Sequence, residues 1–480
     1  MQFSKLVWST KLRAVACFIF AVALIGCGGG GGASSSSSGG GASTQGPSKQ
    51  YGFSGTLTGL TANQKVVITN TNAVSGGVTS TILTSSSPSS QNFVLPSTDL
   101  PGTPYNFTVS PQSYGSTCSI SNGSGIMTAN DVTNIAINCS QTQPSKFEYV
   151  ANFGDNTISA YSINTGNGAL TAVSGSPFTA GTNPVSMVID NSNKFVFVAN
   201  STSNNVTAYK IDSSTGALTQ VTGSPFAAGA NPISIAINPT GQYVYVANRG
   251  GSGSVTAYSI NSTTGVLTPI TGSPYTAAAN PQSLIVDPAG NYLYVANAVS
   301  SVSVFSINSS NGTLSEISGS PFAATSILSH ITIDPTGAFL YAATTNSPTS
   351  SITGYSIDNI TGKLTLVSSG PFASGNWTMG LTIDPSGNYM YAADFGNNSI
   401  SAFSINRTSG LLTSIASSPF LTAGGSGPES IAFDVSSNFV YITDISGGVL
   451  LYSYNSATGA LTSVSRYAAG NSPAFIAITH

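Results

Sequence analysis

The strongest constraint on the fold is a four-residue phrase, Tyr-Val-Ala-Asn or a close variant, that occurs seven times. The copies are spaced 47 to 50 residues apart and begin at Tyr149, Phe197, Tyr245, Tyr294, Tyr341, Tyr391 and Tyr441. Each copy follows an apolar segment and precedes a second apolar segment, a turn that usually contains Gly, and a short Leu-containing segment. A period near 50 residues built from four short strands is typical of a β-propeller blade. The repeat therefore predicts a seven-bladed β-propeller over residues 146–480.

The phase of the repeat predicts how the ring closes. The chain enters the propeller at a Tyr-Val-Ala-Asn strand, the second strand of a blade, and ends in an inner strand at 473–479. One blade must then combine three N-terminal strands from 147–173 with this C-terminal strand. Such a closure removes the free sheet edges that an open array would expose.

Residues 50–141 have a different sequence pattern, in which short segments of alternating apolar and polar residues are separated by turns rich in Gly, Pro and Ser. This pattern predicts a small β-sandwich of immunoglobulin-like type, so the whole chain is expected to be all-β. Cys118 and Cys139 both lie in this segment. In an oxidising compartment they are expected to form a disulfide. The alternative, a pair of metal ligands, has no histidine nearby in the sequence.

The N-terminus has the features of an export signal. Three basic residues precede an apolar run of 12 residues, 14–25, which is too short for a membrane span of about 20 residues. The run ends in Leu24-Ile25-Gly26-Cys27, which resembles a bacterial lipobox. The resemblance implies a signal peptide at 1–26, a lipidated Cys27 and localisation in the cell envelope, anchored in the outer membrane. The alternative is an ordinary signal peptide with an incidental cysteine. Residues 27–49, mostly Gly and Ser, are expected to form a flexible tether.

Composition limits the partners of the chain. Charged residues make up 6% of it, and the formal net charge is −3 with no basic patch, which argues against nucleic acid. The sequence contains no Gly-x-Ser-x-Gly elbow, no Cys nucleophile and no histidine-rich metal set, and we expect no cofactor and no metal.

The repeat resembles the seven-bladed lactonase-type propellers, which include 6-phosphogluconolactonase and muconate-cyclising enzymes, and it overlaps the YVTN surface-layer repeats. The resemblance rests on Asp-Pro-x-Gly, Tyr-Val-Ala-Asn, Val-x-Ala-Tyr-Ser-Ile and Thr-Gly-x-Leu over residues 146–480. It implies the propeller fold and a lactonase-like activity. The chain departs from this family in its arginines, because the phosphate of a phosphosugar would need cationic partners, arginine above all, and the propeller has three arginines, Arg249, Arg407 and Arg466.

Aligning the inner strands gives one ring of residues at a propeller mouth: Ser186, Ser234, Ser283, His330, Gly380, Ser430 and Phe475. His330 is the exceptional member, and the resemblance implies that such a histidine lines the pocket. Glu429 starts an inner strand on the same side and is expected to act with His330 in catalysis. If unperturbed, the pKa of His330 would lie near 6.5, and a nearby carboxylate would raise it. The alternative for His330 is a hydrogen-bonded lining residue.

Three further residues are expected to bind a ligand at this mouth: Arg249, Asp394 and Asp444. The two aspartates end Tyr-Val-Ala-Asn strands, where the alternative is that they tie the following turn to their own side chains. Asp394, Glu429 and Asp444 could also form an oxygen-ligand cation site, although no Asp-x-Asp spacing supports one.

Two functions agree with these residues. The first is an envelope propeller that binds or scaffolds a carbohydrate or protein ligand while its lipid holds it to the membrane. The alternative is a lactone or ester hydrolase that acts outside the cytoplasm through His330. Fold alone does not choose between them.

The lipoprotein interpretation is tested by Cys27→Ser. This substitution removes the thiol that would carry the lipid, so metabolic labelling with a fatty acid should disappear and the protein should become soluble or stay unprocessed. Membrane attachment unchanged from the wild type would contradict the interpretation.

Overall fold

The computed structural model describes residues 49–60, 65–70, 79–84, 90–111, 116–141, 146–345, 350–368, 370–434 and 438–479. The predicted signal peptide, Cys27 and nearly all of the tether lie outside these residues, as does His480. The described residues form strands, with one short 3-10 helix, η1 (Phe395–Asn397). None of the described helices is long and apolar enough to cross a membrane. The all-β prediction is confirmed.

Residues 51–141 form two four-stranded sheets that share one core. The first sheet has the order β4 (Ser90–Asp99), β1 (Tyr51–Thr58), β8 (Val132–Gln141) and β6 (Ser116–Ser121). The second has the order β3 (Thr79–Thr84), β2 (Lys65–Asn70), β5 (Pro104–Pro111) and β7 (Ser124–Ile126). Phe53 of β1, Ile68 of β2 and Phe107 of β5 belong to one buried cluster, so the sheets pack face to face as a sandwich. Its immunoglobulin-like character stays a prediction.

The predicted disulfide is present in this sandwich. Cys118 on β6 lies opposite Cys139 on β8 in the antiparallel register, and the two sulfur atoms are bonded.

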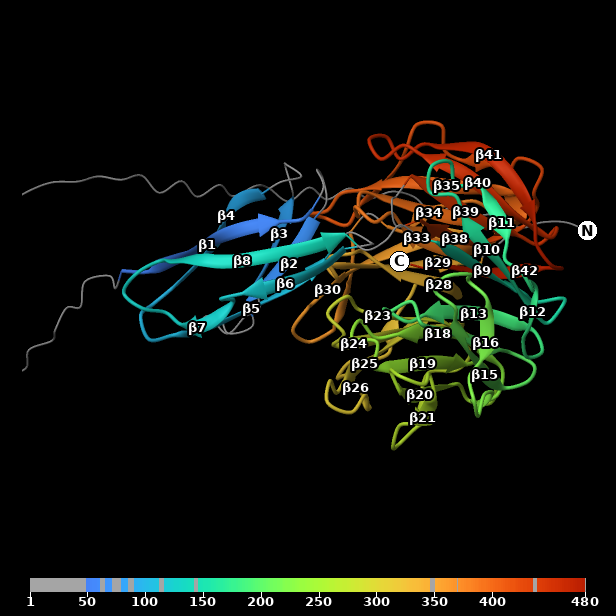
Figure 1. Cartoon of the computed structure of the whole chain (residues 1–480), viewed down its shortest axis with the longest axis horizontal. Helices are drawn as coiled ribbons and strands as arrows, with labels where there is room; N and C mark the ends of the chain where they lie inside the picture. The colour runs from blue at the N-terminus through green and yellow to red at the C-terminus, as the bar shows by residue number, and fades with distance from the viewer. Residues whose placement is uncertain are drawn as a thin grey trace, which may run out of the picture. The chain divides into compact units, whose positions relative to one another are not determined.

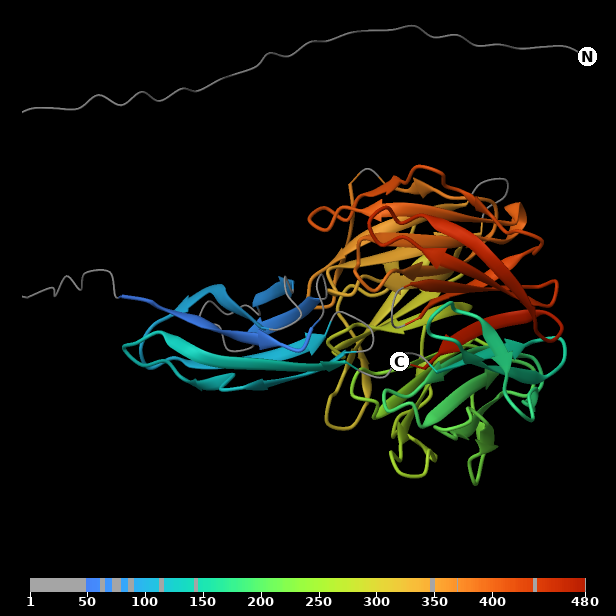
Figure 2. The same ribbon diagram turned by 45° about the horizontal axis from the view of Figure 1, so that its top comes forward.

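The propeller consists of seven sheets arranged in a ring (Figures 1 and 2). In blades 1 to 7 the inner strands are β42 (Pro473–Ile478), β13 (Pro184–Ile189), β18 (Pro232–Ile237), β23 (Pro281–Val286), β28 (Leu328–Ile333), β33 (Thr378–Ile383) and β38 (Pro428–Phe433). The second strands are β9 (Phe147–Asn152), β14 (Phe195–Asn200), β19 (Tyr243–Asn248), β24 (Tyr292–Asn297), β29 (Phe339–Thr344), β34 (Tyr389–Asp394) and β39 (Phe439–Asp444).

The outer half of each blade follows the same order. The third strands are β10 (Thr157–Ile163), β15 (Asn205–Ile211), β20 (Ser254–Ile260), β25 (Ser301–Ile307), β30 (Ser351–Ile357), β35 (Ser399–Ile405) and β40 (Gly448–Tyr454). The outer strands are β11 (Leu170–Ala172), β16 (Leu218–Gln220), β21 (Leu267–Pro269), β26 (Leu314–Glu316), β31 (Leu364–Leu366), β36 (Leu412–Ser414) and β41 (Leu461–Ala468). In blades 1 to 6 a two-residue strand also pairs with the third strand: β12 (Phe178–Thr179), β17 (Phe226–Ala227), β22 (Tyr275–Thr276), β27 (Phe322–Ala323), β32 (Phe372–Ala373) and β37 (Phe420–Leu421).

The ring closes through the C-terminal strand, as the phase of the repeat predicts. In Figure 1, β42 lies beside β9, and Ile476 is paired with Val150 in an antiparallel register. β42 also contacts the inner strands β13 and β38, so the seven inner strands surround one channel.

Neighbouring blades are joined by the tyrosine that opens each Tyr-Val-Ala-Asn phrase. Its hydroxyl donates to a glycine carbonyl in the outer turn of the next blade at 2.6–3.2 Å: Tyr149 to Gly216, Tyr245 to Gly312, Tyr294 to Gly362, Tyr341 to Gly410, Tyr391 to Gly459 and Tyr441 to Gly168. These tyrosines are completely buried. The second blade has Phe197 at this position, which carries no hydroxyl.

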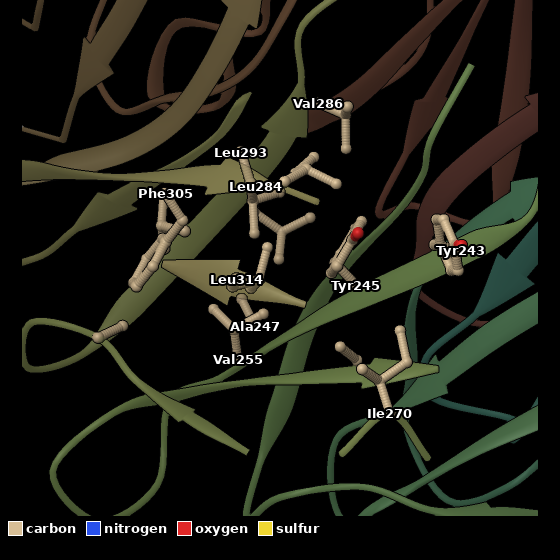
Figure 3. Packing of buried hydrophobic residues seen from close by; sticks show 14 residues of the cluster. Tyr243, Tyr245, Ala247, Val255, Ile270, Leu284, Val286, Leu293, Phe305 and Leu314 are labelled. Carbon is tan, nitrogen blue, oxygen red and sulfur yellow. The ribbon is translucent and has the colours of Figure 1, made fainter. Parts of the chain in front are cut away.

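The accepting glycine is required by the packing as well as by its backbone. Gly312 has φ of +73°, and a Cβ added there would lie 2.5 Å from the ring of Tyr243. The corresponding turn glycine of every other blade has the same relation to the aromatic residue that begins the preceding blade's second strand. Figure 3 shows the seam between blades 3 and 4, where Tyr243 and Tyr245 lie in one cluster with Leu284 and Leu293.

Removing one of these hydroxyls should weaken the ring. Tyr245→Phe leaves the Gly312 carbonyl without this donor in a buried seam, so we expect a loss of about 1–3 kcal/mol in the free energy of unfolding. Phe197→Tyr should act in the opposite direction, because it restores the phenol opposite Gly265. Tyr467→Phe, on the outer strand of blade 7, is the control and should change stability by less than about 0.5 kcal/mol. Denaturant titration measures all three, and equal stabilities for Tyr245→Phe and the control would contradict this role.

A candidate active site in the propeller channel

The channel contains a cavity of about 1010 Å³ lined by the inner strands of all seven blades. At one end of the channel, the lining consists of the first residues of these inner strands and of the residues that follow the second strands. Both sets lie at one mouth because the two strands are antiparallel. This is the mouth that the aligned inner strands predict. His330, Glu429 and Arg249 all belong to the lining, so the structure brings three of the predicted site residues together.

In five of the seven blades the third residue of the inner strand accepts a hydrogen bond from the next blade at the channel wall. In four blades a serine hydroxyl accepts a hydrogen bond from a backbone N–H of the following inner strand: Ser186 from Ile235, Ser234 from Leu284, Ser283 from Ile331 and Ser430 from Ile476. His330 does the same through Nδ1, which accepts from the N–H of Leu381 at 3.3 Å. His330 is therefore a hydrogen-bonded residue of the channel lining, the role that sequence analysis gave as the alternative to catalysis.

This hydrogen bond also determines what the imidazole can do. Because Nδ1 is an acceptor, the proton of the neutral ring is assigned to Nε2. Burial lowers the pKa of His330 to about 4, because the charged form loses hydration in the channel. The unperturbed pKa near 6.5 considered for His330 is therefore wrong, since desolvation is the dominant effect. At neutral pH His330 is an uncharged hydrogen-bond donor.

Burial in the same channel shifts the pKa of Glu429 upward, opposite to its effect on His330. Glu429 is the second residue of β38, is half-buried and lines the cavity. Burial raises the pKa of its carboxyl group to about 7. Among the described residues no hydrogen bond or ion pair engages this carboxylate, and none connects it to His330. Glu429 can therefore exchange a proton near neutral pH.

Gly380 lies between these two residues in the ring, in the inner strand of blade 6. A Cβ added to Gly380 would lie 2.2 Å from the carbonyl oxygen of Glu429, so β33 and β38 approach too closely for any side chain. The absence of a side chain lets the inner strands of blades 6 and 7 pack closely at this point of the channel wall.

Arg249 supplies the cationic side of the cavity, from blade 3. Its Nη2 donates to the Gln282 side-chain oxygen, while its buried Nε has no hydrogen-bond partner among the described residues. Burial lowers its pKa from the usual value, yet a guanidinium stays protonated at neutral pH. The other two propeller arginines are engaged elsewhere: Arg466 pairs with Asp444 at 3.1 Å, and Arg407 donates to the carbonyl of Ser386.

Asp394 and Asp444 do not line the cavity, because their side chains turn back into their own blades. Both are fully buried. Asp394 accepts hydrogen bonds from the hydroxyls of Ser401 and Thr378, and Asp444 accepts from Ser446 and Arg466. The Ser446 contact of Asp444 is the turn-tying role that sequence analysis gave as the alternative to ligand binding, whereas Asp394 instead bonds residues of the neighbouring strands β33 and β35. In the part of the chain that the structure describes, no group of three His, Cys, Asp or Glu side chains could hold a metal.

Sequence reasoning missed the apolar part of this mouth. Phe153, Phe395 and Ile445 line the cavity on the side of blades 1, 6 and 7. They occupy the position of Arg249 in their own blades, directly after the second strand. Aligning that position, as was done for the inner strands, would have found them.

Comparisons with known proteins agree with this architecture. A family model described as "Lactonase, 7-bladed beta-propeller" matches residues 117–233, 222–324 and 317–425. No curated protein matches the chain. A "putative 6-phosphogluconolactonase" from Bacteroides uniformis has a similar structure, with a TM-score of 0.60 at 20% identity, covering 70% of this chain and 100% of that one. The periplasmic gluconolactonase of Pseudomonas aeruginosa is similar with a TM-score of 0.61 at 17% identity, covering 70% and 99%.

Proposed function

Because the chain belongs to the lactonase family of seven-bladed β-propellers, we propose that it hydrolyses a lactone or a related ester in the channel mouth. The observation that carries this proposal is the convergence of His330, Glu429 and Arg249 on one cavity. Only 6% of the residues in this chain are charged, so a titratable acid and a cation in the same cavity indicate chemistry rather than chance.

Glu429 is the general base of this proposal. With a pKa of about 7, it is largely ionised just above neutral pH and still basic enough to accept a proton. The water oxygen bonds to the lactone carbonyl carbon while Glu429 takes a proton from that water. The ring C–O bond then breaks, and the leaving oxygen takes the proton back from Glu429. The product is an open-chain hydroxy acid.

His330 and Arg249 stabilise the charges that this reaction creates. A neutral imidazole with its proton on Nε2 can donate to the carbonyl oxygen as negative charge develops there, without losing a proton itself. Arg249 has a buried Nε–H that is free among the described residues, and such a donor is satisfied by a bound oxygen. We propose that Arg249 binds the hydroxyl groups of the ligand and the carboxylate of the product.

The charges of the cavity favour a lactone without phosphate. A phosphate dianion is normally held by several cationic groups, whereas Arg249 is the one Lys or Arg in the described lining. Sugar lactones without phosphate have the matching chemistry, and one structural relative is described as a periplasmic gluconolactonase. We therefore infer an uncharged sugar lactone.

The N-terminal sequence supports a location outside the cytoplasm for this activity. We propose that the chain is exported, lipidated at Cys27 and held at the outer membrane by the segment 27–49. The support is the basic and apolar leader, the lipobox-like Leu-Ile-Gly-Cys sequence and the cysteine pair of the sandwich.

A second candidate function is ligand binding without turnover. The exposed apolar residues Phe153, Ile327 and Met379 surround the mouth, and such exposure is typical of a binding surface. In this reading the propeller captures a carbohydrate or a protein at the cell envelope, and His330 serves only the channel wall.

Hydrolysis of glucono-1,5-lactone, measured against the spontaneous rate, tests the enzymatic proposal. The enzymatic rate should rise with pH and level off above about pH 7, because the base acts only when its carboxyl group is ionised. Glu429→Gln should lower kcat by roughly 100-fold or more, the range expected for loss of a general base. His330→Gln should lower it less, since one hydrogen-bond donor is replaced by another.

The matched control is Glu316→Gln, which removes an exposed carboxylate on the outer strand of blade 4 and should leave the rate unchanged. Equal rates for the wild type and Glu429→Gln would exclude Glu429 as the base. Tight binding of sugar ligands with no acceleration of any lactone or ester would favour the binding function instead.

A further inference from the structure

Trp377 has a backbone conformation that its residue type rarely adopts. It directly precedes the inner strand of blade 6 and has φ of +54°. Five other blades have a left-handed residue at the same place, which is Asn or Gly in four of them and the small residue Ser in the fifth: Asn183, Asn231, Asn280, Gly427 and Ser472. A bulky aromatic residue in this region is an outlier, and such outliers are concentrated at functional sites.

The loop around Trp377 is held by the common architecture of the mouth. The N–H of Phe395 donates to the carbonyl of Trp377 at 3.0 Å, and the N–H of Gly396 donates to that of Asn376 at 2.9 Å. Equivalent bonds join the two loops in other blades, as from Arg249 to Asn231. The fold therefore imposes the conformation whatever the side chain is. Because the side chain is 47% exposed, its own burial does not explain why tryptophan is present.

The indole extends the apolar wall of the cavity outward. Its ring centroid lies 6.2 Å from that of Phe395, with an interplanar angle of 39°. Phe395 and Met379 line the cavity, and the Phe395 ring reaches Gly427 of blade 7. Glu429, two residues after Gly427, lines the cavity from the same blade. A ligand at Glu429 that continues toward solvent on this side therefore meets Phe395 and then Trp377.

The opposite wall has a different character. Arg249 and Gln282 lie in blades 3 and 4 and offer hydrogen bonds. The cavity, at about 1010 Å³, is at the upper limit of the roughly 300–1,000 Å³ of drug-sized pockets, larger than a single six-membered ring needs. The site thus has room, and an aromatic surface, for a second ring beyond the one that reacts.

We propose that Trp377 and Phe395 form a subsite for a sugar ring attached to the lactone, so that the substrate class is a disaccharide or longer aldonolactone. This inference rests on the proposed lactonase function. One face of a pyranose ring presents C–H groups, which carry partial positive charge and pack against the electron-rich face of an indole. An uncharged ring also suits a wall formed by Trp377, Phe395 and Met379, which carry no charge.

The test uses the full chain and two lactones, cellobiono-1,5-lactone and glucono-1,5-lactone. The main variant is Trp377→Asn, because Asn is the residue that three other blades use in this conformation and should fold at least as well. We expect kcat/KM for cellobionolactone to fall by about five- to tenfold, mainly through KM. The value for gluconolactone should stay within twofold of the wild type. Trp377→Phe should recover most of the loss.

Leu421→Ala is the control variant, since Leu421 is an exposed apolar residue on the outer part of the same blade. It should alter neither lactone. An equal fall for both lactones in Trp377→Asn, or no fall for either, would overturn the subsite while leaving the lactonase function intact.

A second measurement does not depend on turnover. The chain has two tryptophans, Trp8 and Trp377, so Trp8→Phe leaves Trp377 as its single tryptophan. Cellobionic acid, the product, should change the fluorescence of this variant in a saturable way, whereas gluconic acid should change it far less. If neither lactone is hydrolysed but cellobionic acid still gives this change, the lactonase function fails and the sugar subsite stands. No change with cellobionic acid would overturn the subsite.

Discussion

The propeller depends on one repeated contact, in which an aromatic residue of one blade packs on a turn glycine of the next. In six of the seven blades a tyrosine two residues further along then donates its hydroxyl to the carbonyl of that glycine. The contact needs both partners, because the glycine provides a left-handed turn and the space for the ring. It explains why two distant parts of the repeat have to keep the same residue types. It also fixes the spacing of the inner strands, and through them the positions of the channel side chains.

Within that frame the channel changes the ordinary chemistry of its few ionisable groups. Loss of hydration raises the pKa of Glu429 to about 7 and lowers that of His330 to about 4. Near neutral pH Glu429 can then accept a proton, while His330 is an uncharged hydrogen-bond donor. The proposed hydrolysis needs one group of each kind. Gly380, on the inner strand between those of His330 and Glu429, lets β33 and β38 approach closely. The proposed function depends on two exceptions, His330 and Glu429, at wall positions where other blades carry mainly serine or apolar residues.

Much of the fold could be predicted because the sequence pattern of a blade occurs seven times in the chain. Its period gave the number of blades, and its phase gave the pairing of β42 with β9. The hydrogen-bond partner of the buried tyrosine could not be predicted from the sequence, since it depends on how far one blade is rotated from the next. For the site, alignment identified the mouth with His330 and Glu429. It failed for Asp394 and Asp444, because sequence position does not show whether a strand-end side chain faces the channel or its own blade. Buried hydroxyls such as Ser401 decide that.

A crystal structure with a hydrolysis-resistant lactam analogue of a sugar lactone tests the account most directly. The account predicts that the ring occupies the channel mouth, with the lactam carbonyl oxygen within hydrogen-bond distance of His330 Nε2. The Glu429 carboxylate should lie beside the carbonyl carbon, one water away, with Arg249 bound to the ring hydroxyls. An analogue bound at the opposite rim, among the Asp-Pro-x-Gly turns, would contradict it.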